Sequence, residues 1–162
     1  MRFAYTYCFI AAVVLGGCAG RLDSALTRAK KSRQPIFVGR LHPTKPDALG
    51  ATHPVAELFN TSYKTYKYVN LHVKAYNRVG DVILPDDDET PVVTLRFTGP
   101  LPPLRTPGNT VWRKITFSDT AVCFQLERIG IEHMDGTKRT LEGPALREVK
   151  ANHLNRPCPT PL

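Results

Sequence analysis

The clearest pattern along the chain is an alternation of apolar and polar residues at positions 66–76, YKYVNLHVKAY. Four apolar residues fall on one face of this segment: Val69, Leu71, Val73 and Ala75. A period of two is that of a half-buried antiparallel strand. Turn residues at 77–81 then interrupt the alternation, and an apolar run resumes at 82–84. This order predicts a hairpin.

Later segments repeat this short rhythm. Residues 93–98 alternate, and residues 112–117 alternate again after a proline-rich loop. Between 121 and 133 the apolar parity switches, and a bulge at Glu127–Arg128 would keep both halves on one core. The residues MDGT at 134–137 predict a tight turn between two antiparallel strands.

These patterns predict a mainly β fold, a single immunoglobulin-like antiparallel β-sandwich of about six or seven strands. An open barrel is the alternative. The length of 162 residues suits one domain and not two. Residues 55–67 fit either a helical turn or an irregular first strand, and their pattern does not decide between the two.

The start of the chain has a different character. A single basic residue, Arg2, precedes an uncharged stretch from Phe3 to Leu15. This stretch is too short to span a bilayer, which takes about 20 apolar residues, and it is typical of a secretory signal peptide. We therefore predict that residues 1–17 are removed on export.

The residues Leu15-Gly16-Gly17-Cys18 resemble the lipobox of bacterial lipoproteins. The resemblance implies that Cys18 is acylated, with palmitate among its lipids, and becomes the new N-terminus of a membrane-anchored protein. Because Ala19 and not Asp follows Cys18, it also implies the periplasmic side of the outer membrane. The alternative is ordinary cleavage after Ala19, which leaves a soluble secreted protein.

Both routes leave Cys123 and Cys158 as the unmodified cysteines, because Cys8 departs with the signal peptide and Cys18 is either acylated or removed. In an oxidising compartment this pair favours a disulfide, and two buried free thiols are the alternative. Closing this loop contributes roughly 3 to 4 kcal/mol in the chain-entropy model. The bridge would tie the proline-rich tail, residues 155–162, to the sandwich.

The net charge of +8 is concentrated near the proposed anchor. Segment 21–33 has apolar residues at helical spacing and four basic residues close to its end: Arg28, Lys30, Lys31 and Arg33. Each cation near anionic headgroups contributes about 1 kcal/mol, so this segment is either a membrane-proximal helix or a solvated spacer. Prolines and a glycine interrupt residues 42–54. We therefore predict a basic tether over 18–54 and the sandwich over 55–154.

Three pieces of residues 66–141 resemble small sandwich domains of bacterial envelope lipoproteins, the FxLyD-like group among them. The pieces are AYNRVGDVI, FTGPLPPLRTPGNTVW and CFQLERIGIEHMDGT. The resemblance lies in the chemistry of the turns. It implies a β-sandwich in an envelope setting and no shared active site.

The chain has no GxSxG, GxGxxG or Walker motif, and its five histidines lack zinc-site spacing. We therefore predict no catalytic residues, no metal and no cofactor. The acidic run 86–89 offers oxygen ligands for calcium, but its successive carboxylates point in alternating directions, which favours a solvated loop. His72 and His133 lie on predicted strands, where they would either meet across a sheet or remain surface residues. Asn60-Thr61-Ser62 matches the glycosylation pattern of secreted eukaryotic proteins.

Aromatic and basic residues share the polar face of the strand at 66–76. This possible partner face consists of Tyr68, His72, Lys74 and Tyr76. Such residues suit single-stranded nucleic acids, but export leaves few of these partners, and we predict none. The sequence thus favours a non-enzymatic envelope lipoprotein whose sandwich binds an envelope protein or serves as an accessory module. The alternatives are a soluble, effector-like basic protein that binds a host protein or polyanion, and a small envelope hydrolase.

Overall fold

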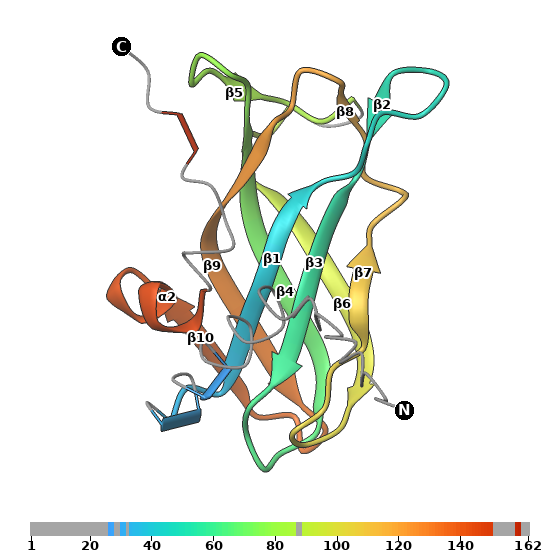
Figure 1. The fold of residues 1–162 in the computed structure, drawn as a ribbon. Helices are drawn as coiled ribbons and strands as arrows, with labels where there is room; N and C mark the ends of the chain where they lie inside the picture. Colours follow the sequence, from blue (N-terminus) through green and yellow to red (C-terminus); the bar gives the residue numbers. More distant parts are fainter. Residues whose placement is uncertain (1–25, 28–29, 32, 87–88, 151–157, 160–162) are drawn as a thin grey trace, which may run out of the picture.

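The computed structural model describes residues 26–27, 30–31, 33–86, 89–150 and 158–159. These residues form mainly β-strands, which are arranged in two antiparallel sheets that face each other (Figure 1). The predicted mainly β fold and its sandwich arrangement are confirmed. Ten strands are formed within the described residues, more than the six or seven predicted, because several of them are only two residues long.

The larger sheet is built around β4 (Tyr66–Tyr76). Strand β9 (Cys123–His133) pairs with one edge of β4, and β10 (Lys138–Glu142) continues the sheet beyond β9. Strands β6 (Val93–Leu101) and β5 (Val82–Ile83) pair with the other edge of β4.

The second sheet has the order β1 (Ile36–Pro43), β3 (Pro54–Asn60) and β7 (Gly108–Val111). It lies in front of the larger sheet in Figure 1. A short pair, β2 (Ala51–Thr52) with β8 (Phe117–Ser118), lies at the upper end of the sandwich in that view.

The core between the sheets follows from the alternation in β4. Its four predicted apolar residues are fully buried: Val69, Leu71, Val73 and Ala75. His72 and Val73 of β4 pair with Arg128 and Leu126 of β9. Glu127 lies between these two partners and is therefore the extra residue of a bulge in β9. This bulge keeps Leu126 and Ile129 buried on the same side of the strand, as predicted.

Both predicted turns are formed. In the β4–β5 turn, Asn77 Oδ1 accepts hydrogen bonds from the backbone N–H groups of Val79 (3.0 Å) and Asp81 (2.9 Å). In the β9–β10 turn, Gly136 has a φ of 80°, a conformation that favours glycine. The two hairpins on which the fold prediction rested are therefore confirmed.

The prediction of a strand at residues 112–117 is wrong for all of these residues except Phe117, which begins β8. Residues 112–115 form a turn, closed by a hydrogen bond from the Ile115 N–H to the Trp112 carbonyl at 3.1 Å. The Trp112 indole N–H donates to the carbonyl of Arg96 at 2.7 Å. This contact at β6 holds the Trp112 side chain and explains why the alternation at this position does not belong to a strand.

The predicted boundary between tether and sandwich is also wrong, because β1 lies inside residues 18–54. Ile36, Phe37 and Val38 are all buried, on both faces of the strand. The pairing of β1 with β3 shifts between Val38 and Leu41. A strand buried on both faces shows no alternation, and the irregularity hides the period further. Residues 55–60, which fitted either a helical turn or a strand, belong to β3.

The described C-terminal part packs beside this first strand. Helix α2 (Pro144–Val149) buries Leu146 and Val149 and contacts β1, β9 and β10. Lys150 then forms a parallel bridge with Val38. The beginning and the end of the described domain are therefore held together at the edge of the second sheet.

Candidate functional site

The residues predicted to form a partner face lie along the outer side of the larger sheet. Tyr68, His72, Lys74 and Tyr76 are half-buried and alternate with the core residues of β4. The strand register adds two residues that the sequence analysis missed: Arg96 of β6 and Arg128 of β9, opposite Asn70 and His72 respectively. We call the set of seven residues the outer strip: Tyr68, Asn70, His72, Lys74, Tyr76, Arg96 and Arg128.

Two cations lie near the ring of Tyr68. The guanidinium carbon of Arg96 and the ammonium of Lys67 each lie 5.2 Å from the centre of the Tyr68 ring. Arg96 also donates a hydrogen bond from Nε to Asn70 Oδ1 at 3.0 Å. Cation–π contacts of this kind contribute about 0.5 to 1 kcal/mol at exposed sites. These contacts favour one orientation of the Tyr68 ring on the outer strip.

His72 lies in the middle of the outer strip. Its Nδ1 is 3.0 Å from the Thr94 hydroxyl and 3.4 Å from an Arg128 guanidinium nitrogen. Desolvation by burial, together with the charge of Arg128, lowers the pKa of His72 below its ordinary value. The imidazole is therefore neutral at pH 7 and acts as a hydrogen-bonding group without adding a charge.

Ion pairs balance the charges along and beside the outer strip. Lys67 lies 3.4 Å from Glu132, and Arg128 lies 3.8 Å from Glu142. Lys74 lies 4.0 Å from Glu127, the residue of the β9 bulge. Glu127 and Glu142 thus offset two of the three cations of the outer strip, and this face suits a partner with both signs of charge, such as a folded protein.

The predicted membrane-proximal residues are placed only in part. Arg28 lies outside the described residues, as does Cys18. Lys30, Lys31 and Arg33 are exposed, in the segment that leads toward β1. The predicted lipidation site is therefore not described, and its acylation stays a prediction.

The cysteine pair is brought together as predicted. Cys123, the first residue of β9, and Cys158 form a disulfide, with Cα atoms 5.7 Å apart. Cys123 lies opposite Tyr76 in the register with β4, so the bridge attaches the described end of the chain to the larger sheet.

Two predictions about isolated side chains do not agree with the structure. His72 pairs with Arg128 and His133 pairs with Tyr66, so the two histidines do not meet across the sheet. His133 is also not a surface residue, since only 8% of it is exposed.

The glycosylation pattern falls on a buried amide. Asn60 is 1% exposed, and its Nδ2 donates to the carbonyls of Lys64 (2.7 Å), Leu101 (3.0 Å) and Pro102 (3.0 Å). Its Oδ1 accepts hydrogen bonds from the backbone and the hydroxyl of Ser62. A sugar has no access to this nitrogen in the folded domain.

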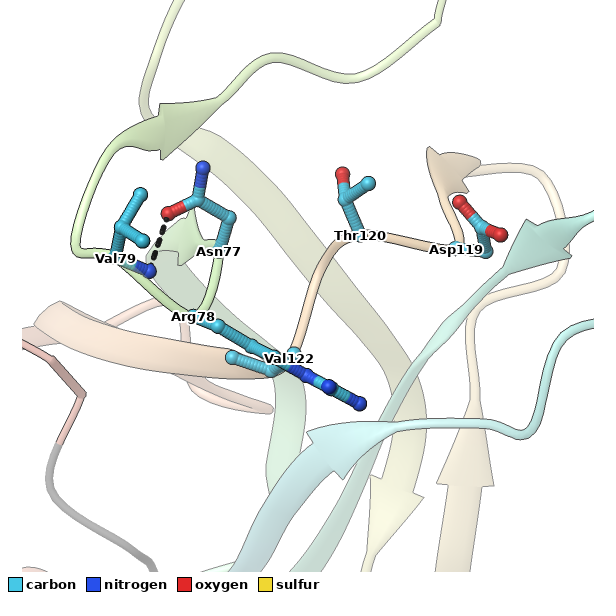
Figure 2. A pocket seen from close by; sticks show the side chains of 6 residues that line it. All are labelled: Asn77, Arg78, Val79, Asp119, Thr120 and Val122. Carbon is cyan, nitrogen blue, oxygen red and sulfur yellow. Dashed lines mark hydrogen bonds between the residues drawn. The ribbon is translucent and has the colours of Figure 1, made fainter.

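A pocket of about 360 Å³ lies at the end of the molecule where β4 ends. Figure 2 shows Asp119 and Thr120 on one loop, across from the turn formed by Asn77, Arg78 and Val79. The Asn77 carboxamide is occupied by its own turn, and the Thr120 hydroxyl lies 2.6 Å from that of Ser118. Of its described lining residues, Arg78 and Asp119 are charged, with opposite signs, and none form a pair of nucleophile and base.

Within the described part of the chain, no three His, Cys, Asp or Glu side chains gather in an arrangement that would hold a metal ion. The acidic run 86–89 is described only at its two ends, Asp86 and Glu89, both of which are exposed. No helix among the described residues has the length and apolar character needed to cross a membrane. Comparison with protein-family models, with curated proteins and with solved structures finds no match to this chain.

Proposed function

We propose that the protein is a non-enzymatic bacterial cell-envelope lipoprotein, acylated at Cys18, whose β-sandwich binds an envelope protein through the outer strip. Membership of the FxLyD-like group of immunoglobulin-like sandwiches is part of this proposal. It rests on the three turn motifs at residues 66–141 and on the lipobox-like residues LGGC.

The observation that carries the proposal is the disulfide between Cys123 and Cys158. Disulfides persist in oxidising compartments and are rare in the cytosol. A bridge in this domain therefore supports export, as does the apolar leader. It also leaves Cys18 as the one cysteine of the exported chain without a partner cysteine, directly after the leader.

Carboxylates beside the outer strip offset two of its three cations, Lys74 and Arg128, which supports a protein partner. Tyrosine and arginine are the residue types enriched where proteins bind each other, and Tyr68 and Arg96 are in contact. A polyanion would favour an uncompensated basic surface, whereas Glu132 and Glu142 neutralise part of this face.

The anchor is tested by growing cells with labelled palmitate. The wild-type protein is expected to incorporate the label and to fractionate with membranes, and Cys18→Ser is expected to lose both properties. A label that Cys18→Ser retains would contradict acylation at this residue. An unlabelled wild-type protein in the medium would favour the secreted alternative.

The partner surface is tested with a photo-crosslinking residue at Asn70, at the centre of the outer strip. The matched control is Asn109, an exposed asparagine on β7 of the other sheet. Crosslinks to an envelope protein are expected from position 70 and not from 109, and Arg96→Ala should reduce them. Equal crosslinking from both positions would contradict a partner site on the outer strip.

A further inference from the structure

The end of the sandwich where β4 begins carries a basic cavity of about 650 Å³. Four segments that are distant in sequence line it: Lys30, Arg33, Gln34 and Pro35 before β1, Thr61, Ser62 and Tyr63 between β3 and β4, Leu104 between β6 and β7, and Arg139 of β10. Its volume lies in the usual range of small-molecule sites.

Hydrogen bonds hold the walls of the basic cavity in place. The Thr61 N–H donates to the Pro35 carbonyl at 3.1 Å, and the Thr61 hydroxyl donates to the Gln34 carbonyl at 2.5 Å. The buried hydroxyl of Tyr66 donates to the same Pro35 carbonyl. The segment before β1 is thus fixed against the β3–β4 loop, and the cavity exists before any ligand binds.

The charge of the basic cavity is not compensated by its lining. Among the residues that the structure describes, three cations line it, Lys30, Arg33 and Arg139, and no carboxylate does. No acidic side chain among the described residues forms an ion pair with any of the three. The neighbouring carboxylate of Glu148 accepts a hydrogen bond from the Gln34 side chain instead. A cavity with these properties attracts an anion.

The rim of the basic cavity adds two side chains that a soluble anion does not need. Tyr63 is 87% exposed and Leu104 is 50% exposed. An aromatic ring with a polar tip, an aliphatic side chain and several cations together are typical of surfaces that lie in the headgroup region of a membrane.

We propose that the basic cavity binds the phosphate group of an anionic phospholipid headgroup and seats this end of the sandwich on the membrane surface. The inference rests on the proposed function for the presence of a membrane. Cys18 and Lys30 are twelve positions apart, so even a fully extended chain keeps the cavity within about 40 Å of an acylated Cys18.

Such docking sets the direction of the partner face. Tyr66 at the start of β4 lies next to the basic cavity, and Tyr76 lies at the far end of the same strand. The outer strip would therefore point away from the membrane, with Tyr68 nearest to the headgroups and Tyr76 farthest from them.

The test uses Tyr63→Trp, which keeps an interfacial aromatic residue in place and reports contact with lipid by fluorescence. Protein purified from cells, with the N-terminus that it carries there, is combined with vesicles of phosphatidylcholine, with or without phosphatidylglycerol, brominated near the headgroup. Val79→Trp, at an exposed position in the opposite end, is the matched control.

Quenching is expected for Trp at position 63 in vesicles that contain phosphatidylglycerol, and not at position 79. Adding Arg139→Gln to Tyr63→Trp should lower the ratio of docked to undocked protein about five-fold. This factor corresponds to the loss of about 1 kcal/mol, the contribution of one cation near anionic headgroups. Arg78→Gln removes the same charge at the far end and should leave the ratio unchanged. Arg139 is exposed, and circular dichroism verifies that each variant is folded.

Three results would overturn the headgroup site: equal quenching at positions 63 and 79, equal quenching without phosphatidylglycerol, or an equal effect of Arg78→Gln. Binding of soluble polyphosphate that Arg139→Gln abolishes, without docking on vesicles, would assign the cavity to a soluble polyanion and overturn the lipid assignment. The N-terminal mass of the same preparation is measured separately. Docking without an acyl group would refute the anchor and leave the headgroup site standing.

Discussion

The hydroxyl of Tyr66 donates a hydrogen bond to the carbonyl of Pro35, which joins the first residue of β4 to the segment that enters β1. Tyr66 is fully buried, and its oxygen also lies 2.9 Å from the Ser62 hydroxyl. Burial raises the pKa of Tyr66, so the phenol keeps its proton and remains a donor. This contact links the two sheets at the end that carries the basic cavity.

Replacing Tyr66 with phenylalanine tests that link. The ring still fills its place in the core, but the buried carbonyl of Pro35 loses a donor. Because the Thr61 N–H still donates to that carbonyl, we expect Tyr66→Phe to lower the free energy of unfolding by about 0.5 to 1.5 kcal/mol, measured by urea denaturation. Tyr63→Phe is the control, since Tyr63 is exposed, and it should change stability by less than about 0.5 kcal/mol. Equal stability of the two variants would contradict the link.

Asn60 makes the densest set of side-chain hydrogen bonds in the described domain, and Asn60→Asp replaces its donor group with an oxygen facing three backbone carbonyls. We expect this variant to lose at least about 3 kcal/mol, because a buried charge would lack partners. Asn109→Asp, on an exposed residue, should stay within about 0.5 kcal/mol of the wild type. A tolerated Asn60→Asp in urea denaturation would show that this amide is not buried.

The disulfide encloses a sequence separation of 35 residues. In the chain-entropy model such a loop stabilises the fold by about 4 kcal/mol. We expect the double variant Cys123→Ala with Cys158→Ala to lose an amount of this order in denaturant unfolding. Alkylation of the native wild-type protein should leave both cysteines unmodified until a reductant is added. Two thiols that react without reductant would contradict the bridge.

His133 gives the domain a pH-dependent stability. Desolvation by burial and the charge of nearby Lys64 lower the pKa of His133. The unfolded chain therefore binds the proton at a higher pH than the folded chain does. The neutral His133 therefore contributes its full stabilisation above about pH 6.5, the pKa of histidine in the unfolded chain. This stabilisation is lost as the pH falls through the lower pKa of His133 in the folded chain.

The variant His133→Phe should remove this dependence. Its ring keeps an aromatic contact with Tyr66, whose ring centre lies 5.2 Å away, and Nδ1 of His133 has no hydrogen-bond partner among the described residues. Between about pH 7 and pH 5, we expect the variant to lose less free energy of unfolding than the wild type does. The slope of this free energy against pH should be reduced by at most about 1.4 kcal/mol per pH unit. An unchanged slope would assign the acid sensitivity to other groups.

The alternation of apolar and polar residues was enough to predict the main strands of the larger sheet, but not their order. In β4 the buried set beginning with Val69 defines one face, and the change of parity around Glu127 predicts the bulge in β9. Both features are encoded in local periodicity. Strand β1 was missed because Ile36, Phe37 and Val38 are buried without alternation, beside a basic segment that resembles a linker.

The candidate sites were only partly predictable. Tyr68 and His72 share a face because they belong to one strand, and the sequence shows this directly. Their neighbours Arg96 and Arg128 depend on the register between strands that are distant in sequence, which no local pattern specifies. The basic cavity is formed by four segments that are distant in sequence. No local pattern around Arg139 therefore indicated that this residue lines a cavity.

The measurement that tests the central claim most directly is mass spectrometry of the mature N-terminus in protein purified from the cells that produce it. Export with acylation predicts a chain that begins at Cys18 and carries a diacylglyceryl group on the sulfur. A chain that begins at Gly20 without lipid, or one that retains Met1 and the leader, would contradict the lipoprotein account.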